Sequence, residues 1–419
     1  MVDLFKIILD VFFALWWIWL PIFLYWLFFT LWLAYARQKY WQSIEWTVLE
    51  IIPPKEVEGS PKPFEQIFSG LYGLVGTVDT FSDVYFKGII QNFFSLEIVG
   101  IEGKIHFLIR FPSRFRNLIE AQFYAQYPHV EIREFEDYVN NVPAVIPNKE
   151  WDLWGTKLLL SKPDPYPIRT YPQFLEISGE EQKRFIDPLS SLMEVMSKLK
   201  VGEQIWVQIL CRPADNSWRD EGKKILDKML GKVVKKKKGF IESEIEGWSN
   251  LASDTFSQVV LGVGPSDKKE ERVTANLASG EQEVVKAIEL NITKTGFDTK
   301  IGFVYIAKKD ILSKVNVSGT FGAFSQFNTL NLNGFKLDKA TMTVAKGHPD
   351  FIDNEIKRFR KMTILRLFKE RSFWEKGYVL NLEELATIFH FPATAVVAPR
   401  TPRIETKTGV PPNSLPIAR

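Results

Sequence analysis

The residue types that most often supply a nucleophile, a proton or a metal ligand are sparse and scattered in this chain. It has a single cysteine, Cys211, and four histidines at positions 106, 129, 348 and 390. None of the histidines has a serine, cysteine or aspartate at a spacing typical of nucleophilic catalysis. His106 lies in an alternating stretch and is expected to be satisfied inside a sheet, whereas His390 is expected to pack or cap. Cys211 ends an apolar run, which predicts a buried and inert thiol.

Motifs that bind nucleotides or carry out hydrolysis are also missing. The chain contains neither G-x-x-x-x-G-K-[ST] nor G-x-G-x-x-G, and it lacks the G-x-S-x-G and H-E-x-x-H motifs. One cysteine allows no intramolecular disulfide and no cysteine-rich zinc site. We therefore expect a chain that is not an enzyme by itself and that uses no cofactor and no metal.

Two basic clusters are the candidates for a binding site. The first is the run Lys235, Lys236, Lys237 and Lys238; the second, on a predicted basic helix over 353–371, includes Lys357, Arg358, Arg360 and Lys361. Either could contact nucleic-acid phosphates or anionic lipid headgroups, at about 1 kcal/mol per charge for lipid. The alternative is a solvated loop and a solvated helix face. Because 53 basic residues stand against 50 acidic ones, any such contact must be local.

An apolar segment near the N-terminus predicts a membrane anchor. Val11–Ala34 is 24 residues long and carries no charge. As a helix it would span roughly 36 Å, enough for a hydrocarbon core of about 30 Å. A signal peptide is the alternative, because Ala34-Tyr35-Ala36 resembles a cleavage site, but its apolar region would run to only about 7–15 residues. The expected anchor residues are Trp16, Trp17, Trp19, Trp26, Trp32, Arg37 and Lys39.

The charges on either side of this segment indicate its orientation. Arg37 and Lys39 follow it, whereas Lys6 before it is offset by Asp3 and Asp10. Positive residues tend to stay in the cytoplasm, so the larger C-terminal part is expected to be cytoplasmic. The sequence therefore predicts a single-pass protein of the inner or plasma membrane.

The elements after the anchor predict an α+β fold. A chain of 419 residues suggests two or three domains, and we place the anchor at 1–37 and a first unit at 38–150. Apolar periodicity gives this unit the order β-α-β-β-α-β, which is the split βαβ or ferredoxin-like pattern. Its expected elements are strand 45–52, helix 61–75, a hairpin over 95–111 turning at Glu102-Gly103, a helix capped by Ser113 that runs to 126, and strand 129–136.

A second, looser unit is expected over 151–391. It also reads as ferredoxin-like, interrupted by a flexible insertion at about 231–280 that is rich in glycine, serine and charge. Its expected strands are 156–162, 203–211 and 301–308, and its expected helices are 187–199, 218–230, 281–292 and 310–323. The proline-rich tail 392–419 lacks apolar periodicity and is expected to be extended.

Several blocks of the chain resemble an uncharacterised bacterial domain. These are the stretch from FFSLEIVGIEGKIHFLIRF to EFEDYV, then WDLWGTKLLLSKPDPYPIRTYPQF, DPLSSLMEVMSKLKVGEQIWVQILCRP and LNLEELATIFHFP. The domain precedes the motor domain in type IV secretion and conjugation ATPases, notably those of candidate-phylum bacteria with reduced genomes. The resemblance covers about 40–416 and implies no catalytic residues. In such relatives a Walker-type ATPase would follow the tail, whereas this chain stops at Arg419, so a separate ATPase subunit is implied.

The expected function combines these observations. The chain is expected to be a membrane-anchored, non-catalytic scaffold of a type IV secretion or conjugation-like machine for DNA or protein transfer, docking an ATPase partner. The alternative is a membrane-tethered protein that binds nucleic acid or anionic lipid through its basic patches. The expected partners are the membrane and a separate ATPase subunit, with homo-oligomerisation and nucleic-acid binding left open.

Overall fold

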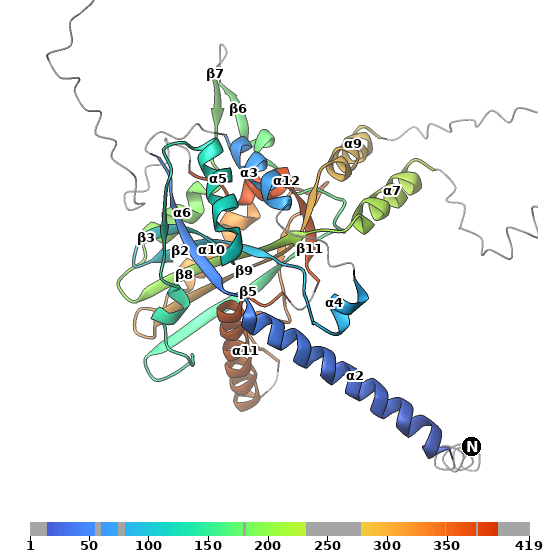
Figure 1. Ribbon diagram of the computed structural model, residues 1–419. Helices are drawn as coiled ribbons and strands as arrows, with labels where there is room; N and C mark the ends of the chain where they lie inside the picture. The colour runs from blue at the N-terminus through green and yellow to red at the C-terminus, as the bar shows by residue number, and fades with distance from the viewer. Residues whose placement is uncertain are drawn as a thin grey trace, which may run out of the picture.

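A mixed α/β body with one long projecting helix forms the protein (Figure 1). The structure is a computed structural model and describes residues 15–54, 60–73, 80–178, 182–231, 278–347, 349–373 and 376–392. Among the sequence-based candidates, the lysine run 235–238, His348 and the tail after 392 lie outside the described residues. Within the described part, nine strands form one antiparallel sheet and a separate pair forms a short hairpin.

The projecting helix, α2, spans Trp16–Ser43 and is 28 residues long. Pro21 lies inside it without ending it. Its side chains are largely exposed, including Trp16 at 56%, Trp17 at 62% and Trp26 at 59%. A helix of this length with an apolar surface on all sides is long and apolar enough to cross a membrane. The sequence prediction of a long apolar N-terminal helix is confirmed to that extent.

The first half of the sheet is built from four strands, paired in the order β4-β1-β3-β2. Each neighbouring pair is antiparallel. The hairpin between β2 and β3 turns at Glu102 and Gly103, which have φ values of 50° and 85°. Two consecutive positive φ values are typical of the tight turns that match strand twist. The elements are β1 (Trp46–Ile52), α3 (Lys62–Tyr72), α4 (Phe81–Tyr85), β2 (Phe94–Ile101), β3 (Lys104–Pro112), α5 (Arg116–Gln126) and β4 (Glu131–Glu134).

The second half repeats this arrangement. Its strands pair in the order β10-β5-β9-β8, and β8 pairs with β2, so that the sheet runs without a break through both halves. The elements are β5 (Trp151–Leu160), α6 (Ser190–Ser197), β8 (Glu203–Pro213), α7 (Ser217–Met229), α9 (Ser279–Thr293), β9 (Gly296–Lys308), α10 (Lys314–Ser325) and β10 (Phe335–Leu337). The expected insertion falls between α7 and α9, and its residues 232–277 lie outside the described part.

Helices cover the sheet on both faces (Figure 1). On one face lie α3, α5, α6, α10 and α12 (Leu382–Ile388), and their apolar side chains form the larger core with the strands. On the other face α11 (Asp350–Glu370) packs through Ile364, Leu365 and Phe368 against residues that include Trp206. Strand β11 (Tyr378–Asn381) pairs with β9 and leads directly into α12.

Some elements differ from the sequence predictions. Ser113 does not cap a helix: it begins a 3-10 turn, η1 (Ser113–Phe115), and its hydroxyl accepts a hydrogen bond from Thr47 at 2.7 Å. The 3-10 turn moves the start of the α-helix to Arg116, with Phe115 at the N-cap position. The elements α4, β10 and β11, and the hairpin of β6 (Leu175–Ser178) with β7 (Gln182–Phe185), were not expected, because runs of three to five residues carry too little periodicity.

Candidate functional site

The C-terminal end of α2 is packed against the body. Trp41 lies 5.2 Å from Trp46 and 5.5 Å from Phe93, measured between ring centroids, and its stacking on Phe93 is nearly parallel at 14°. Phe93 in turn lies 5.5 Å from Phe373, which follows α11 in the chain. Aromatic pairs at these distances stabilise a contact beyond the area that they bury. The helix therefore joins the body through a packed aromatic cluster.

The loop around α4 forms a second contact with α2. Trp32 donates a hydrogen bond from Nε1 to the carbonyl of Tyr85 at 3.1 Å, and the ring of Tyr85 lies 5.5 Å from Phe29. Gly88 has a φ of 64°, and a Cβ there would lie 2.3 Å from the backbone carbon of Ala36. Only glycine permits so close an approach with that backbone conformation. Two separate contacts therefore fix the direction in which α2 leaves the body.

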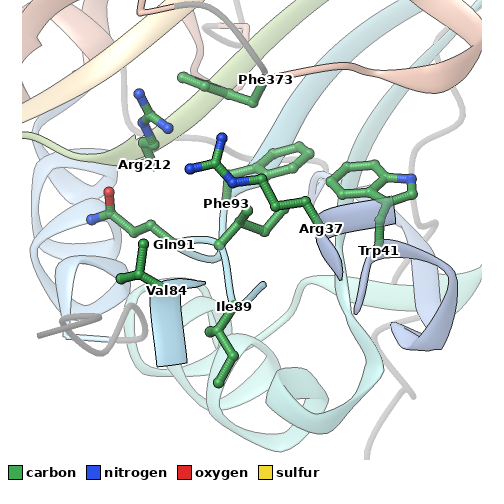
Figure 2. A pocket seen from close by; sticks show the side chains of 9 residues that line it. Arg37, Trp41, Val84, Ile89, Gln91, Phe93, Arg212 and Phe373 are labelled. Atoms are coloured by element: carbon green, nitrogen blue, oxygen red, sulfur yellow. The ribbon is translucent and has the colours of Figure 1, made fainter. Parts of the chain in front are cut away.

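A cavity of about 310 Å³ lies in this junction (Figure 2). Four parts of the chain supply its walls: α2, α4 with the segment that follows it, the end of β8, and Phe373 shortly after α11. Of the lining residues that the structure describes, none is acidic and two are arginines. They are Arg37, Trp41, Val84, Ile89, Ile90, Gln91, Phe93, Arg212 and Phe373.

The two arginines differ in how they are held. Arg212 makes two hydrogen bonds to Asp298, of 2.9 Å from Nε and 2.7 Å from Nη2, and its guanidinium lies 4.4 Å from the ring centroid of Phe373. The Nε atom of Arg37, by contrast, is buried and has no hydrogen-bond partner among the described residues. Figure 2 shows Arg37 extending across the cavity toward Arg212. Within the described part of the chain, the Arg212 charge is therefore paired with a carboxylate, whereas the Nε atom of Arg37 has no acceptor.

A buried network of charged side chains around Arg371 positions Phe373, which lines the cavity. Arg371 is 0% exposed and has a φ of 49° where α11 ends. It donates to both oxygens of Glu97 at 2.7 and 3.0 Å, and to both oxygens of Asp137 at 2.8 Å. Tyr138 donates to Glu97 at 2.6 Å, and burial raises the pKa of this phenol well above its usual range. The network therefore fixes the end of α11, two residues before Phe373.

The structure separates the predicted anchor residues into two groups. The side chains of Trp16, Trp17 and Trp26 are exposed on the outer part of α2, as a membrane span requires. Trp19 also lies on α2, and Trp32 lies at the contact with Tyr85. Arg37 lines the junction cavity, whereas Lys39 lines a neighbouring cavity with Phe86 and Lys87.

The predicted basic residues on α11 do not join this cavity. Lys361 donates to Asp152 at 2.6 Å, and Arg360 donates to the carbonyls of Met342 and Val344 at 3.2 and 2.5 Å. These two side chains hold α11 to the neighbouring chain segments. Lys357 is partly exposed and Arg358 is exposed.

His106, His390 and Cys211 contact neighbouring protein groups and are largely shielded from solvent. His106 pairs through Nδ1 with Glu50 at 2.5 Å, and His390 lies 3.0 Å from the Ala386 carbonyl and 3.2 Å from Asp187. Both positions confirm the expected satisfied or packed side chains. Cys211 is buried, as predicted, and desolvation raises the pKa of its thiol well above the usual range. In the described part of the chain, no group of three or more His, Cys, Asp or Glu residues is arranged to hold a metal ion.

Sequence reasoning missed most of the cavity. Gln91, Arg212 and Phe373 are isolated in the sequence and meet only through strand pairing and the Arg371 network. It also missed a second cleft, of about 330 Å³, where five separate lysines converge beside Asp164 and Asp338. The lysines are Lys157, Lys162, Lys300, Lys336 and Lys376. No local sequence signal marks either place.

Comparison with known proteins assigns the chain to a family. None of the curated proteins compared with it matches. The chain does match the family described as a domain of unknown function (DUF8128) over residues 41–403. That range contains the body and every residue of the junction cavity except Arg37. Because the match covers most of the sequence, the chain belongs to the DUF8128 family.

Proposed function

We propose that this chain is a membrane-anchored, non-catalytic scaffold that holds its body in a fixed pose at the cytoplasmic face of the membrane. The observation that carries the proposal is the packed junction at the end of α2. A simple tether would need only a flexible linker, whereas here Trp41, Phe93 and Gly88 fix the direction of the helix. A fixed direction is useful when the body must present a surface to another subunit.

The surroundings of α4 support the placement against the membrane. Phe81 and Phe86 are each 65% exposed, on the segment whose Tyr85 contacts Phe29 of α2. If α2 crosses the bilayer, these rings lie at the depth where aromatic side chains are enriched. Arg37 and Lys39 then lie on the cytoplasmic side, in agreement with the positive-inside tendency.

The two halves of the body suggest how it presents a surface. We propose that each is a split βαβ, or ferredoxin-like, unit, supported by the matching strand orders β4-β1-β3-β2 and β10-β5-β9-β8. Joining through β2 and β8 leaves β4 and β10 at the two edges of the sheet. Unpaired edge strands can extend a sheet into a partner. The type IV secretion or conjugation-like setting and the ATPase partner rest on the sequence resemblance.

Purification of the full chain from its native membrane tests this proposal. A photoreactive amino acid in place of Arg133, on edge strand β4, should crosslink to an ATPase subunit, because this side chain is half exposed at 49%. The measurement is mass spectrometry of the crosslinked product. The same photoreactive residue in place of Glu194, exposed on α6, is the control and should give at most a weak product. Recovery of this chain alone from both positions would contradict the docking role.

A second candidate function, binding of a polyanion such as nucleic acid, is favoured by the five-lysine cleft. Lys336 and Lys376 are its exposed members. We expect the double variant Lys336→Ala/Lys376→Ala to weaken duplex DNA binding and to lower the slope of log affinity against log salt by about 1.8, since each phosphate contact contributes about 0.9. The matched control, Lys357→Ala/Arg358→Ala on α11, should leave the slope as it is. If the slope of log affinity against log salt is the same for both variants, the cleft does not contact the nucleic acid.

A further inference from the structure

We propose that the junction cavity binds the phosphate of an anionic phospholipid headgroup. This inference rests on α2 crossing the membrane, as proposed above. It assigns a ligand class to a place where Arg37, Arg212 and Gln91 converge between aromatic walls.

The depth of the cavity matches that of lipid phosphates. Arg37 follows Ala34, the last residue of the uncharged segment, by three positions, which is about 4.5 Å along a helix. When the apolar segment fills the hydrocarbon core, the Arg37 side chain therefore lies at headgroup level. Val84 of α4 lines the cavity, and Phe81 in α4 and Phe86 directly after it are both exposed.

The donors in the cavity suit an anion. The buried Nε of Arg37 has no acceptor among the described residues, and a buried donor without a partner costs about 1–3 kcal/mol. Arg212 uses Nε and Nη2 for Asp298, and its Nη1 makes no hydrogen bond to another described residue. Gln91 donates to the Pro213 carbonyl at 3.1 Å, and its amide nitrogen has a second hydrogen. Guanidinium groups are the side chains best suited to phosphate, because their N–H groups can bond two of its oxygens.

The walls favour a lipid over a small soluble anion. Ile89, Ile90, Phe93 and Phe373 line the cavity together with the arginines. A ligand that carries hydrocarbon next to its phosphate can contact both kinds of surface. Because none of the described lining residues is acidic, a headgroup with a cationic amine is disfavoured, and the geometry points to a lipid with a net negative charge.

The test is native mass spectrometry of the full chain in detergent with added phosphatidylglycerol. We expect the wild type to retain one phosphatidylglycerol. The Arg37→Gln variant should bind it at least about tenfold more weakly, since hydrogen bonds to charged groups contribute roughly 1.5–3 kcal/mol. Lys39→Gln is the matched control, because it removes the same charge from the same end of α2 but from outside this cavity. It should bind as the wild type does.

Two further arms identify the ligand. Phosphatidylcholine should be retained at least tenfold more weakly, and equimolar inorganic phosphate should not displace phosphatidylglycerol. Equal binding by Arg37→Gln and wild type, equal retention of phosphatidylcholine, or displacement by inorganic phosphate would each overturn the inference. Carbonate extraction of native membranes separates this result from the anchoring proposal. A chain that resists extraction yet retains no lipid overturns the lipid site alone, and an extracted chain overturns both.

Discussion

Replacing Arg371 by leucine is expected to lower the free energy of unfolding of the body by about 3–5 kcal/mol, because it leaves the buried carboxylate of Glu97 without its paired cation. Glu97 is 0% exposed and shares Arg371 with Asp137, so no solvent can take over its solvation. Arg371→Lys should lose less, since it keeps the charge but not the forked donors. Chemical denaturation of the full chain in detergent, followed by near-UV circular dichroism, gives the free energies.

The matched control for this prediction lies on the same helix. Arg366 is exposed on α11, and Arg366→Leu should change stability by no more than about 0.5 kcal/mol. Adding Glu97→Gln to Arg371→Leu should recover part of the loss, because it removes the largest uncompensated charge. If Arg371→Leu unfolds at the same denaturant concentration as Arg366→Leu, the network does not stabilise the body.

Local sequence signals predicted the parts of the fold that local physics determines. The alternation on either side of Glu102-Gly103 gave the β2–β3 hairpin, and the apolar spacing from Phe64 to Leu71 gave α3. In each of these elements, the spacing of the apolar residues along the segment itself determines which face is buried. The boundary between β11 and α12 depends instead on Asn381, whose side chain caps the helix while Glu384 bonds back to its backbone.

The candidate site required information that no single segment contains. Arg37 was predicted from its position after the apolar segment, but only as a topological flank. Arg212 lies near the end of β8 and lines the cavity because β8 pairs with β2. Phe373 lines it because the hydrogen bonds of Arg371 fix the position of the chain at the end of α11. Strand pairing across more than 100 residues has no local sequence signature. The basic runs do have one, so the sequence pointed to them as binding sites instead.

The stability of the folded body is expected to fall as the pH rises from about 4.5 to about 8, because Glu384 is buried. Desolvation raises the pKa of this carboxyl from 4.5 to about 8, against the opposing effect of backbone hydrogen bonds from Asn381 and Ile168, both of 2.8 Å. The folded state therefore binds one more proton than the unfolded state within this window. The stabilisation is complete below about 4.5 and is lost as the pH passes about 8, and its upper limit is about 5 kcal/mol.

Asp164 contributes in the same direction over a lower range. Burial raises its pKa from 3.8 to about 6, although it accepts a hydrogen bond from the Val379 amide at 3.0 Å. The loss of stability attributable to Asp164 is therefore complete near pH 6. Between about pH 6 and 8, the slope of the unfolding free energy against pH contains the contribution of Glu384 without that of Asp164.

Glu384→Gln should flatten the pH profile of the unfolding free energy above about pH 6, because an amide does not titrate. Near pH 5, where the wild-type carboxyl is still protonated in the folded state, it should lower stability by roughly 1–2 kcal/mol, since the amide nitrogen cannot accept one of the two backbone N–H groups. This deficit should shrink or reverse as the pH approaches about 8, because only the wild type loses stability over that range. Glu383→Gln is the matched control: this neighbour pairs with Lys294 near the surface and should leave the slope in place. The measurement is denaturant unfolding of the full chain at several values from about pH 5 to about 9. A Glu384→Gln profile as steep as the wild type would show that another group takes up the proton.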